Sequence, residues 1–155
     1  MAIWITDRTQ ADVDRVNELH DKANVGTWTE EERIEWAAGM KGALSYMDYN
    51  RIESGVSELA ATLGASVSIK TNWTVEGYMT TSDANRWLSN VSNIRAKCSG
   101  PGGLPSTPTS MDKLAYKTMN EIEEILAKIE RIANDHLLYC SEPICGGEFN
   151  YAYSL

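Results

Sequence analysis

The apolar and polar positions of this chain follow the period of an amphipathic α-helix over much of its length. Apolar side chains recur at steps of three and four over residues 49–63, and Gly64 follows where such a helix would end. A second stripe covers residues 87–94, and the capping-box sequence of residues 29–32 predicts the start of another helix. The pattern predicts a mainly α fold, a small bundle of amphipathic helices with short extended segments.

Other segments have the alternating pattern of extended chain. Residues 65–78 are rich in β-prone side chains and predict a short strand or an extended connector, and residues 3–5 are similar. Near the C-terminus, Phe149, Tyr151 and Tyr153 alternate as strand residues do. This β-like terminus either pairs within its own chain or offers an edge to the sheet of a partner.

One stretch divides the chain by its composition. Residues 99–110 consist almost entirely of Gly, Pro, Ser and Thr, which neither hold a helix nor bury much area. We therefore expect a helical domain over residues 1–98, a linker over 99–110, a long helix over 111–139 and an aromatic, strand-like tail over 140–155.

The expected long helix has an apolar seam. Ile122, Ile125, Ile129, Ile132 and His136 follow one another at steps of 3, 4, 3 and 4, which is the spacing of a heptad repeat. Isoleucine at both seam positions favours a coiled coil of three or four helices over one of two helices. Two interpretations stay open: the seam joins copies of the chain in a trimer or higher symmetry, or it docks the helix onto its own domain.

A short pattern, Asp-x-(Asn/Asp)-Arg-apolar, occurs three times, with its copies 48 − 12 = 36 and 83 − 48 = 35 residues apart. Each copy predicts a helix N-terminus, because an Asp there accepts hydrogen bonds from free backbone N–H groups and complements the helix dipole. The Arg three residues on is expected to meet its Asp across one turn. The alternative is that the three Arg side chains line a common ligand surface. The pairs are Asp12 with Arg15, Asp48 with Arg51, and Asp83 with Arg86.

Tryptophan accompanies each copy of the pattern. Trp4, Trp36 and Trp73 precede the three copies, and Trp87 ends the third. Because Trp supplies a large buried area, we expect these four side chains to serve as core residues or contact anchors.

The net charge narrows the class of partner. Acidic residues outnumber basic ones by 22 to 14, a net charge of −8, which repels nucleic acid and anionic membrane surfaces. No apolar stretch approaches the roughly 20 residues of a membrane span, and no basic signal-peptide region follows Met1. We therefore expect a soluble, unexported protein that binds neither nucleic acid nor membrane.

The sequence offers little catalytic or metal chemistry. Cys140 and Cys145 stand alone at a spacing unlike that of zinc sites, and a disulfide between them is an open alternative. His20 and His136 lie in helical patterns without a nucleophile motif around them. Acidic clusters are typical of solvated helix faces. We therefore expect no enzyme, no cofactor and no metal, and an enzyme would require an unrecognised carboxylate site.

Several segments resemble minor structural proteins of tailed bacteriophages and prophages of Gram-positive bacteria. In those proteins a Trp-Thr element is followed by an Asp-Tyr-Asn-Arg-Ile helix start. Here the corresponding segments are residues 4–9, 47–53, 71–74, 83–86 and the aromatic, Gly-Glu ending at 139–148. The chain departs from the pattern in having Asp14 in place of Asn and Trp87 in place of Ile.

The resemblance implies a part of the virion, made in the host cytoplasm and present in symmetric copies. Its expected role is to hold other virion proteins in place in the tail, neck or a fibre, or to act in attachment, with no catalytic residues. The alternative is a cytosolic adaptor or regulator that binds a host protein through the long helix.

Overall fold

The computed structural model describes residues 2–98, 103–111 and 115–141, without the side chains of 136–141. Its helices are α1 (Gln10–Asn24), α2 (Glu30–Ala37), α3 (Tyr46–Leu63), α4 (Thr81–Lys97) and α5 (Tyr116–Ser141). The prediction of a mainly helical chain is confirmed. In the described part of the chain, residues 65–78 and 3–5 are extended connectors without strand pairing. The predicted aromatic strand with Phe149, Tyr151 and Tyr153 lies outside the described residues, as does the side chain of His136.

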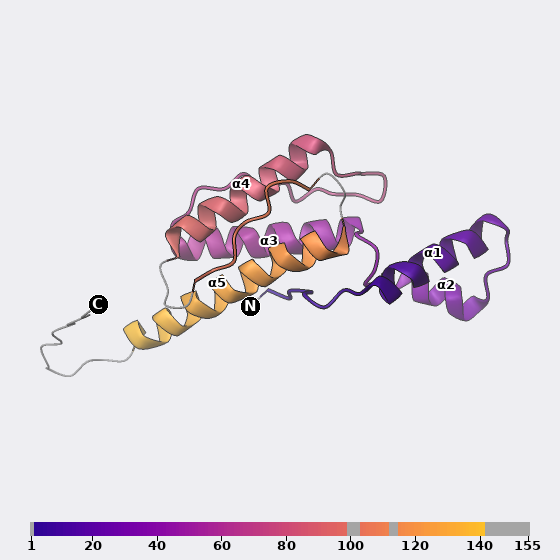
Figure 1. The fold of residues 1–155 in the computed structure, drawn as a ribbon, viewed down its shortest axis with the longest axis horizontal. Coiled ribbons are helices and arrows are strands. Elements are labelled where there is room, and N and C mark those ends of the chain that lie inside the picture. The colour runs from indigo at the N-terminus through magenta and orange to yellow at the C-terminus, as the bar shows by residue number, and fades with distance from the viewer. Residues whose placement is uncertain (1, 99–102, 112–114, 142–155) are drawn as a thin grey trace, which may run out of the picture.

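Three of the helices run in the same direction. Figure 1 shows that α3, α4 and α5 all begin at the end of the molecule that carries α1 and α2. Residues 65–80 before α4 and residues 103–111 before α5 run along the helices in the opposite sense, and the N-terminal segment does the same before it enters α1. We call α3, α4 and α5 the three-helix core and the projecting pair α1 and α2 the helical hairpin.

The 35-residue interval between the second and third copies of the pattern extends to a third helix, α5. Equivalent positions in α3, α4 and α5 differ by 85 − 50 = 35 and 120 − 85 = 35 residues. Their buried apolar side chains are equivalent too, so the three helices present the same face to the core. The equivalent buried sets are Ile52, Trp87 and Ile122; Val56, Val91 and Leu126; and Leu59, Ile94 and Ile129.

The helical hairpin stands outside this repeat. Leu19 is the one buried side chain of α1, whereas α3 and α4 each bury six or more residues. The pattern in the sequence predicts the Asp12 copy as the first of three equivalent helix starts. The third equivalent helix is α5, whose sequence lacks the Asp-Arg pair that defined the pattern.

The seam of α5 lies inside the molecule. Ile122, Ile125 and Ile129 have no exposed surface, and they form one hydrophobic cluster with residues of α3 and α4. Ile132 is partly buried. This burial agrees with the second interpretation of the seam, in which the helix docks onto the chain's own domain. Self-association through α5 would require other residues, because these side chains already have neighbours.

The three repeated Asp residues lie in the first turns of α1, α3 and α4, at the third helical position. The N-cap is the Ser or Thr three residues earlier, so the expectation that Asp itself caps the helix is corrected. The backbone N–H of Thr9, Ser45 and Thr80 donates to the following Asp at 2.7, 3.1 and 3.2 Å. Each start is therefore a capping box, as predicted for Thr29 and Glu32 at α2.

The buried seam predicts a large cost for shortening Ile125. Ile125→Ala should lower the free energy of unfolding by about 2 to 5 kcal/mol, because it leaves a cavity in a closely packed core. Ile34, which is 62% exposed on α2, provides the matched control. Urea denaturation of both variants measures the difference, and equal midpoints would contradict the assignment of Ile125 to the core.

The capping box of α4 predicts a dependence of stability on pH. Burial opposes ionisation of Asp83, but hydrogen bonds from Thr80 and the charge of Lys70 outweigh it and lower the pKa of this carboxyl. Because the folded pKa is depressed, the stabilisation is present above the unfolded pKa of about 4 and is lost as the pH falls through the folded pKa. Asp83→Asn should therefore cost about 0.5 to 1 kcal/mol near neutral pH.

This cost should shrink as the medium is acidified below pH about 4. The measurement is urea denaturation over a series of pH values, with Asp21→Asn as the control because the side chain of Asp21 is 83% exposed. A loss for Asp83→Asn that is the same at every pH would show that the carboxylate charge is not its source.

Candidate functional site

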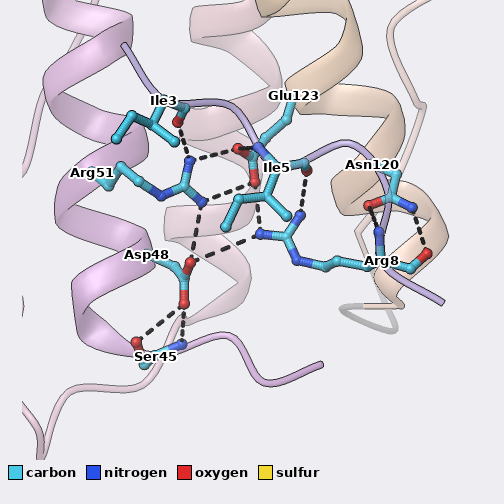
Figure 2. A network of polar contacts seen from close by, with 8 residues as sticks. All are labelled: Ile3, Ile5, Arg8, Ser45, Asp48, Arg51, Asn120 and Glu123. Carbon is cyan, nitrogen blue, oxygen red and sulfur yellow. Dashed lines mark hydrogen bonds and ion pairs between the residues drawn. The ribbon is translucent and has the colours of Figure 1, made fainter. Parts of the chain in front are cut away.

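A buried carboxylate on α5 joins three parts of the chain (Figure 2). Glu123 has no exposed surface. Its oxygens accept hydrogen bonds from Arg8 Nη2 at 2.8 Å, from Arg51 Nη1 and Nη2 at 2.6 and 3.1 Å, and from the backbone N–H of Ile5 at 2.7 Å. The N-terminal segment, α3 and α5 therefore meet at one anion.

A second carboxylate balances the charge of this network. Asp48 lies 3.1 Å from Arg51 and 3.8 Å from Arg8, and the N–H of Ser45 donates to its other oxygen (Figure 2). Two guanidinium groups thus face two carboxylates. Burial opposes the charge of Arg51, but the hydrogen bonds and charges of Glu123 and Asp48 together outweigh burial and raise the pKa of Arg51.

The amide of Asn120, one turn before Glu123 on α5, holds the same N-terminal segment by its backbone. Its oxygen accepts from the N–H of Arg8 at 3.2 Å, and its nitrogen donates to the carbonyl of Arg8 at 2.9 Å. Glu130, farther along α5, accepts from the backbone N–H of Ala2 and from the indole N–H of Trp4. The segment is thus bound along its length by polar side chains of one helix.

The same arrangement occurs between α3 and the connector before α4. Glu53, which is 1% exposed, accepts from both Nη atoms of Arg86, from Trp87 Nε1 at 2.6 Å and from the N–H of Lys70 at 3.3 Å. Asn50 exchanges two hydrogen bonds with the backbone of Trp73, at 3.0 and 3.2 Å. Hydrogen bonds to Glu53 raise the pKa of Arg86 against the opposing effect of burial.

These two sites are equivalent, and we call each an Asn-Glu clamp. In each, Asn and Glu three residues apart on a helix bind backbone groups three residues apart on an extended segment, since 73 − 70 = 3 and 8 − 5 = 3. The position equivalent to Glu53 and Glu123 in α4 is Leu88, so α4 lacks the Glu of the clamp. It binds its neighbouring connectors through Asn90 and Arg95 instead.

The clamps also identify the helical hairpin as an insertion. Arg8 and Trp73 occupy equivalent places in the two clamps, and the caps of the following core helices are Ser45 and Thr80. The first interval is 45 − 8 = 37 residues and the second is 80 − 73 = 7 residues, so the first repeat is longer by 37 − 7 = 30 residues. Those extra residues contain α1 and α2.

The repeated Arg residues serve separate interfaces and share no common surface. Arg51 and Arg86 reach their own Asp, as the sequence predicted, and also a Glu on a neighbouring helix. Arg15 also pairs with a Glu on a neighbouring helix, Glu35 of α2 at 2.6 Å, and with Glu18 at 2.7 Å, but it does not reach its own Asp. The prediction that Arg15 meets its own Asp is wrong, because that carboxylate is held by Thr9 and lies near Lys41.

The four predicted Trp anchors divide into two groups. Trp73 and Trp87 are buried in the three-helix core, where both pack against the ring of Tyr49. Trp4 is partly buried against the core, and its ring lies so close to Gly55 that a Cβ there would come within 2.4 Å of it. Trp36 is 36% exposed and contacts Trp28 at a ring distance of 5.4 Å.

Trp36 belongs to an exposed groove at the base of the helical hairpin. This groove has a volume of about 490 Å³ and lies between the end of α2, the connector into α3 and the turn before α4. We call it the aromatic groove. Its lining includes Trp36, Met40, Met47, Tyr49, Val75 and Tyr78.

Within residues 2–98, 103–111 and 115–135, no group of three or more His, Cys, Asp or Glu side chains is arranged to hold a metal ion. Over the same part of the chain, no helix combines the length and apolar character needed to cross a membrane. Cys98 is partly buried, and burial raises the pKa of its thiol. Cys140 and Cys145, considered above for a disulfide, lie outside the described side chains.

Comparison with known proteins gives no relative: no family model, no curated protein and no solved structure matches the chain. Function must therefore be inferred from the residues themselves.

The Asn-Glu clamps were missed by sequence reasoning, although a signal for them exists. Asn50 and Glu53 recur as Asn120 and Glu123, a distance of 120 − 50 = 70 residues or two repeats. The repeated Asp-Arg pair does not occur in α5, and an acidic run such as residues 121–124 resembles a solvated helix face. Glu123 has the opposite environment, full burial between two arginines.

The Glu123 network predicts a severe loss of stability when its anion is removed. Glu123→Gln leaves Arg8 and Arg51 without their shared carboxylate in the interior, and breaking a buried pair in this way costs about 3 to 5 kcal/mol. The neighbouring Glu124 is about half exposed and, within the described part of the chain, pairs with Lys128, so Glu124→Gln is the matched control, with an expected change below about 1 kcal/mol. Chemical denaturation checks both, and similar losses would contradict the network's role.

Proposed function

We propose that this chain is a non-enzymatic structural protein of a bacteriophage virion, associated with the tail, neck or a fibre, which acts in symmetric assembly or attachment. It is made in the host cytoplasm and holds other virion proteins and further copies of itself. The aromatic tail that follows α5 serves as an additional contact with a partner. The proposal rests on the resemblance of residues 4–9, 47–53, 71–74 and 83–86 to minor structural proteins of tailed phages.

The distribution of charged and apolar side chains supports a binding role over a catalytic one. The deeply buried carboxylates of Glu53 and Glu123 each accept four hydrogen bonds from groups within the chain. A carboxylate held in this way is a structural anion, and a general base would need a free lone pair directed toward substrate. Large apolar side chains are instead exposed around the aromatic groove, as expected for a protein interface.

Copies of the chain would associate through surfaces other than the seam of α5. The seam residues Ile122, Ile125 and Ile129 belong to the core, so symmetric contacts would use the hairpin, the groove or the outer faces of the helices. A cytosolic adaptor that binds one host protein remains the second candidate, and it would use the same exposed surface. The two candidates differ in where the chain is found after phage particles form.

Co-sedimentation with particles tests the proposal. After prophage induction in a strain that encodes the chain, particles purified on a density gradient should contain it in a fixed ratio to the major tail protein, as measured by quantitative mass spectrometry. A washed, uninduced culture provides the control for adventitious binding. Recovery of the chain only in the soluble fraction would contradict the virion role and favour the adaptor.

A further inference from the structure

The aromatic groove has the composition of a docking site. Val75 and Tyr78 are 82% and 84% exposed, and Met47 is 44% exposed, so large apolar side chains face solvent around one concave surface. An apolar groove with exposed aromatic and Met side chains is suited to the apolar face of a partner helix, with a residue every third or fourth position as an anchor. The groove thus favours a peptide segment as its occupant.

The charge around the groove favours one kind of segment. Helix α2, which contributes Trp36 and Ala37 to the lining, has four Glu and one Arg, a net charge of 1 − 4 = −3. The whole helical hairpin, residues 10–37, has eight acidic and three basic residues, a net charge of 3 − 8 = −5. On the other side of the groove, Glu76 is exposed between the lining residues Val75 and Gly77.

The same charges argue against the chain's own tail as the occupant. Residues 142–155 contain Glu142 and Glu148 and no Lys or Arg, so their charge has the same sign as that of the hairpin. The whole chain is also acidic, with a net charge of −8. Like charges disfavour both the tail and a second copy at this surface, whereas basic side chains beside apolar anchors complement it.

We propose that the aromatic groove binds a basic, amphipathic helical segment of a different protein, with its apolar face in the groove and its basic residues along the acidic hairpin. This partner would be one of the proteins held in the assembly role proposed above. The inference rests on that role only for the place where the partner is found. Association should be faster and tighter at low salt, because the hairpin charge steers the basic segment.

A synthetic peptide tests the proposal without knowledge of the natural partner. The probe is a peptide of Leu and Lys at helical spacing, about four turns long, and isothermal titration calorimetry with the whole chain measures its affinity. Two comparison peptides have Glu in place of every Lys, or the same composition in scrambled order. The Leu-Lys helix should bind, and both comparison peptides should bind at least about tenfold more weakly.

Paired variants of the chain separate the groove from general attraction by an acidic protein. A double variant, Val75→Ser with Tyr78→Ser, should weaken peptide binding by roughly tenfold or more, because it removes the exposed apolar anchors of the groove. Val25→Ser is the matched control, since Val25 is 71% exposed at the end of α1 and does not line the groove. Helical content and melting temperature verify that all variants fold.

Each outcome of this experiment either supports or overturns binding of a basic helix in the aromatic groove. Loss of binding in the groove variant with retention in the control supports the proposal. Equal binding by all variants would show attraction to net charge alone and overturn it, as would no binding of the Leu-Lys helix or equal binding of the Leu-Glu helix. Co-sedimentation with particles is measured separately, so a failure of the virion role and a failure of the groove are distinguishable.

Discussion

The fold depends on one buried anion, Glu123, which unites segments that are far apart in sequence. Arg8 lies 115 residues before it and Arg51 lies 72 residues before it, yet both donate to the same carboxylate. Buried ion pairs add little net stability compared with apolar residues of the same size, because desolvation offsets much of the attraction. Their effect is on specificity: any other register of the N-terminal segment would leave the buried guanidinium group of Arg8 without its carboxylate partner.

The Asn-Glu clamps explain how three helices can lie parallel. Consecutive parallel helices require connections that return along the length of the core, and such connections have backbone groups that need partners. Here the returning segments satisfy part of this requirement with helix side chains: Asn50 and Glu53 hold one connector, and Asn120 and Glu123 hold the N-terminal segment. Hydrogen bonds to backbone groups depend little on side-chain identity in the bound segment, which allows Arg8 and Trp73 to occupy equivalent places.

Local sequence signals predicted the helices well, because those signals act within a few residues. The stripe over residues 49–63, the stop at Gly64 and the box at Thr29 each reflect contacts within one or two turns, and α2 and α3 have these features. Gly64 adopts a positive φ of 64°, the left-handed conformation that ends a helix readily.

What the sequence did not reveal depends on contacts between distant residues. A heptad-like seam has the same spacing whether it faces a second copy or the chain's own core, so the location of Ile125 could not be read from period alone. Similarly, Glu123 stands in an acidic run that resembles a solvated surface, and only its arginine partners, from two other parts of the chain, explain its burial. Composition also could not distinguish the linker of residues 99–110 from a connector within one core.

The insertion of the helical hairpin into the first repeat separates the part of the molecule that stabilises the fold from the part that is free to bind. The hairpin contributes one buried apolar side chain of α1, whereas the core helices and both clamps lie outside it. Changes on the acidic face of α2 or at Tyr78 therefore leave the core contacts intact. The aromatic groove arises where this insertion meets the first turn of α3 and the turn before α4, and its lining includes none of the Asn and Glu residues of the two clamps. A surface of this kind can acquire specificity for a partner at little expense to folding stability.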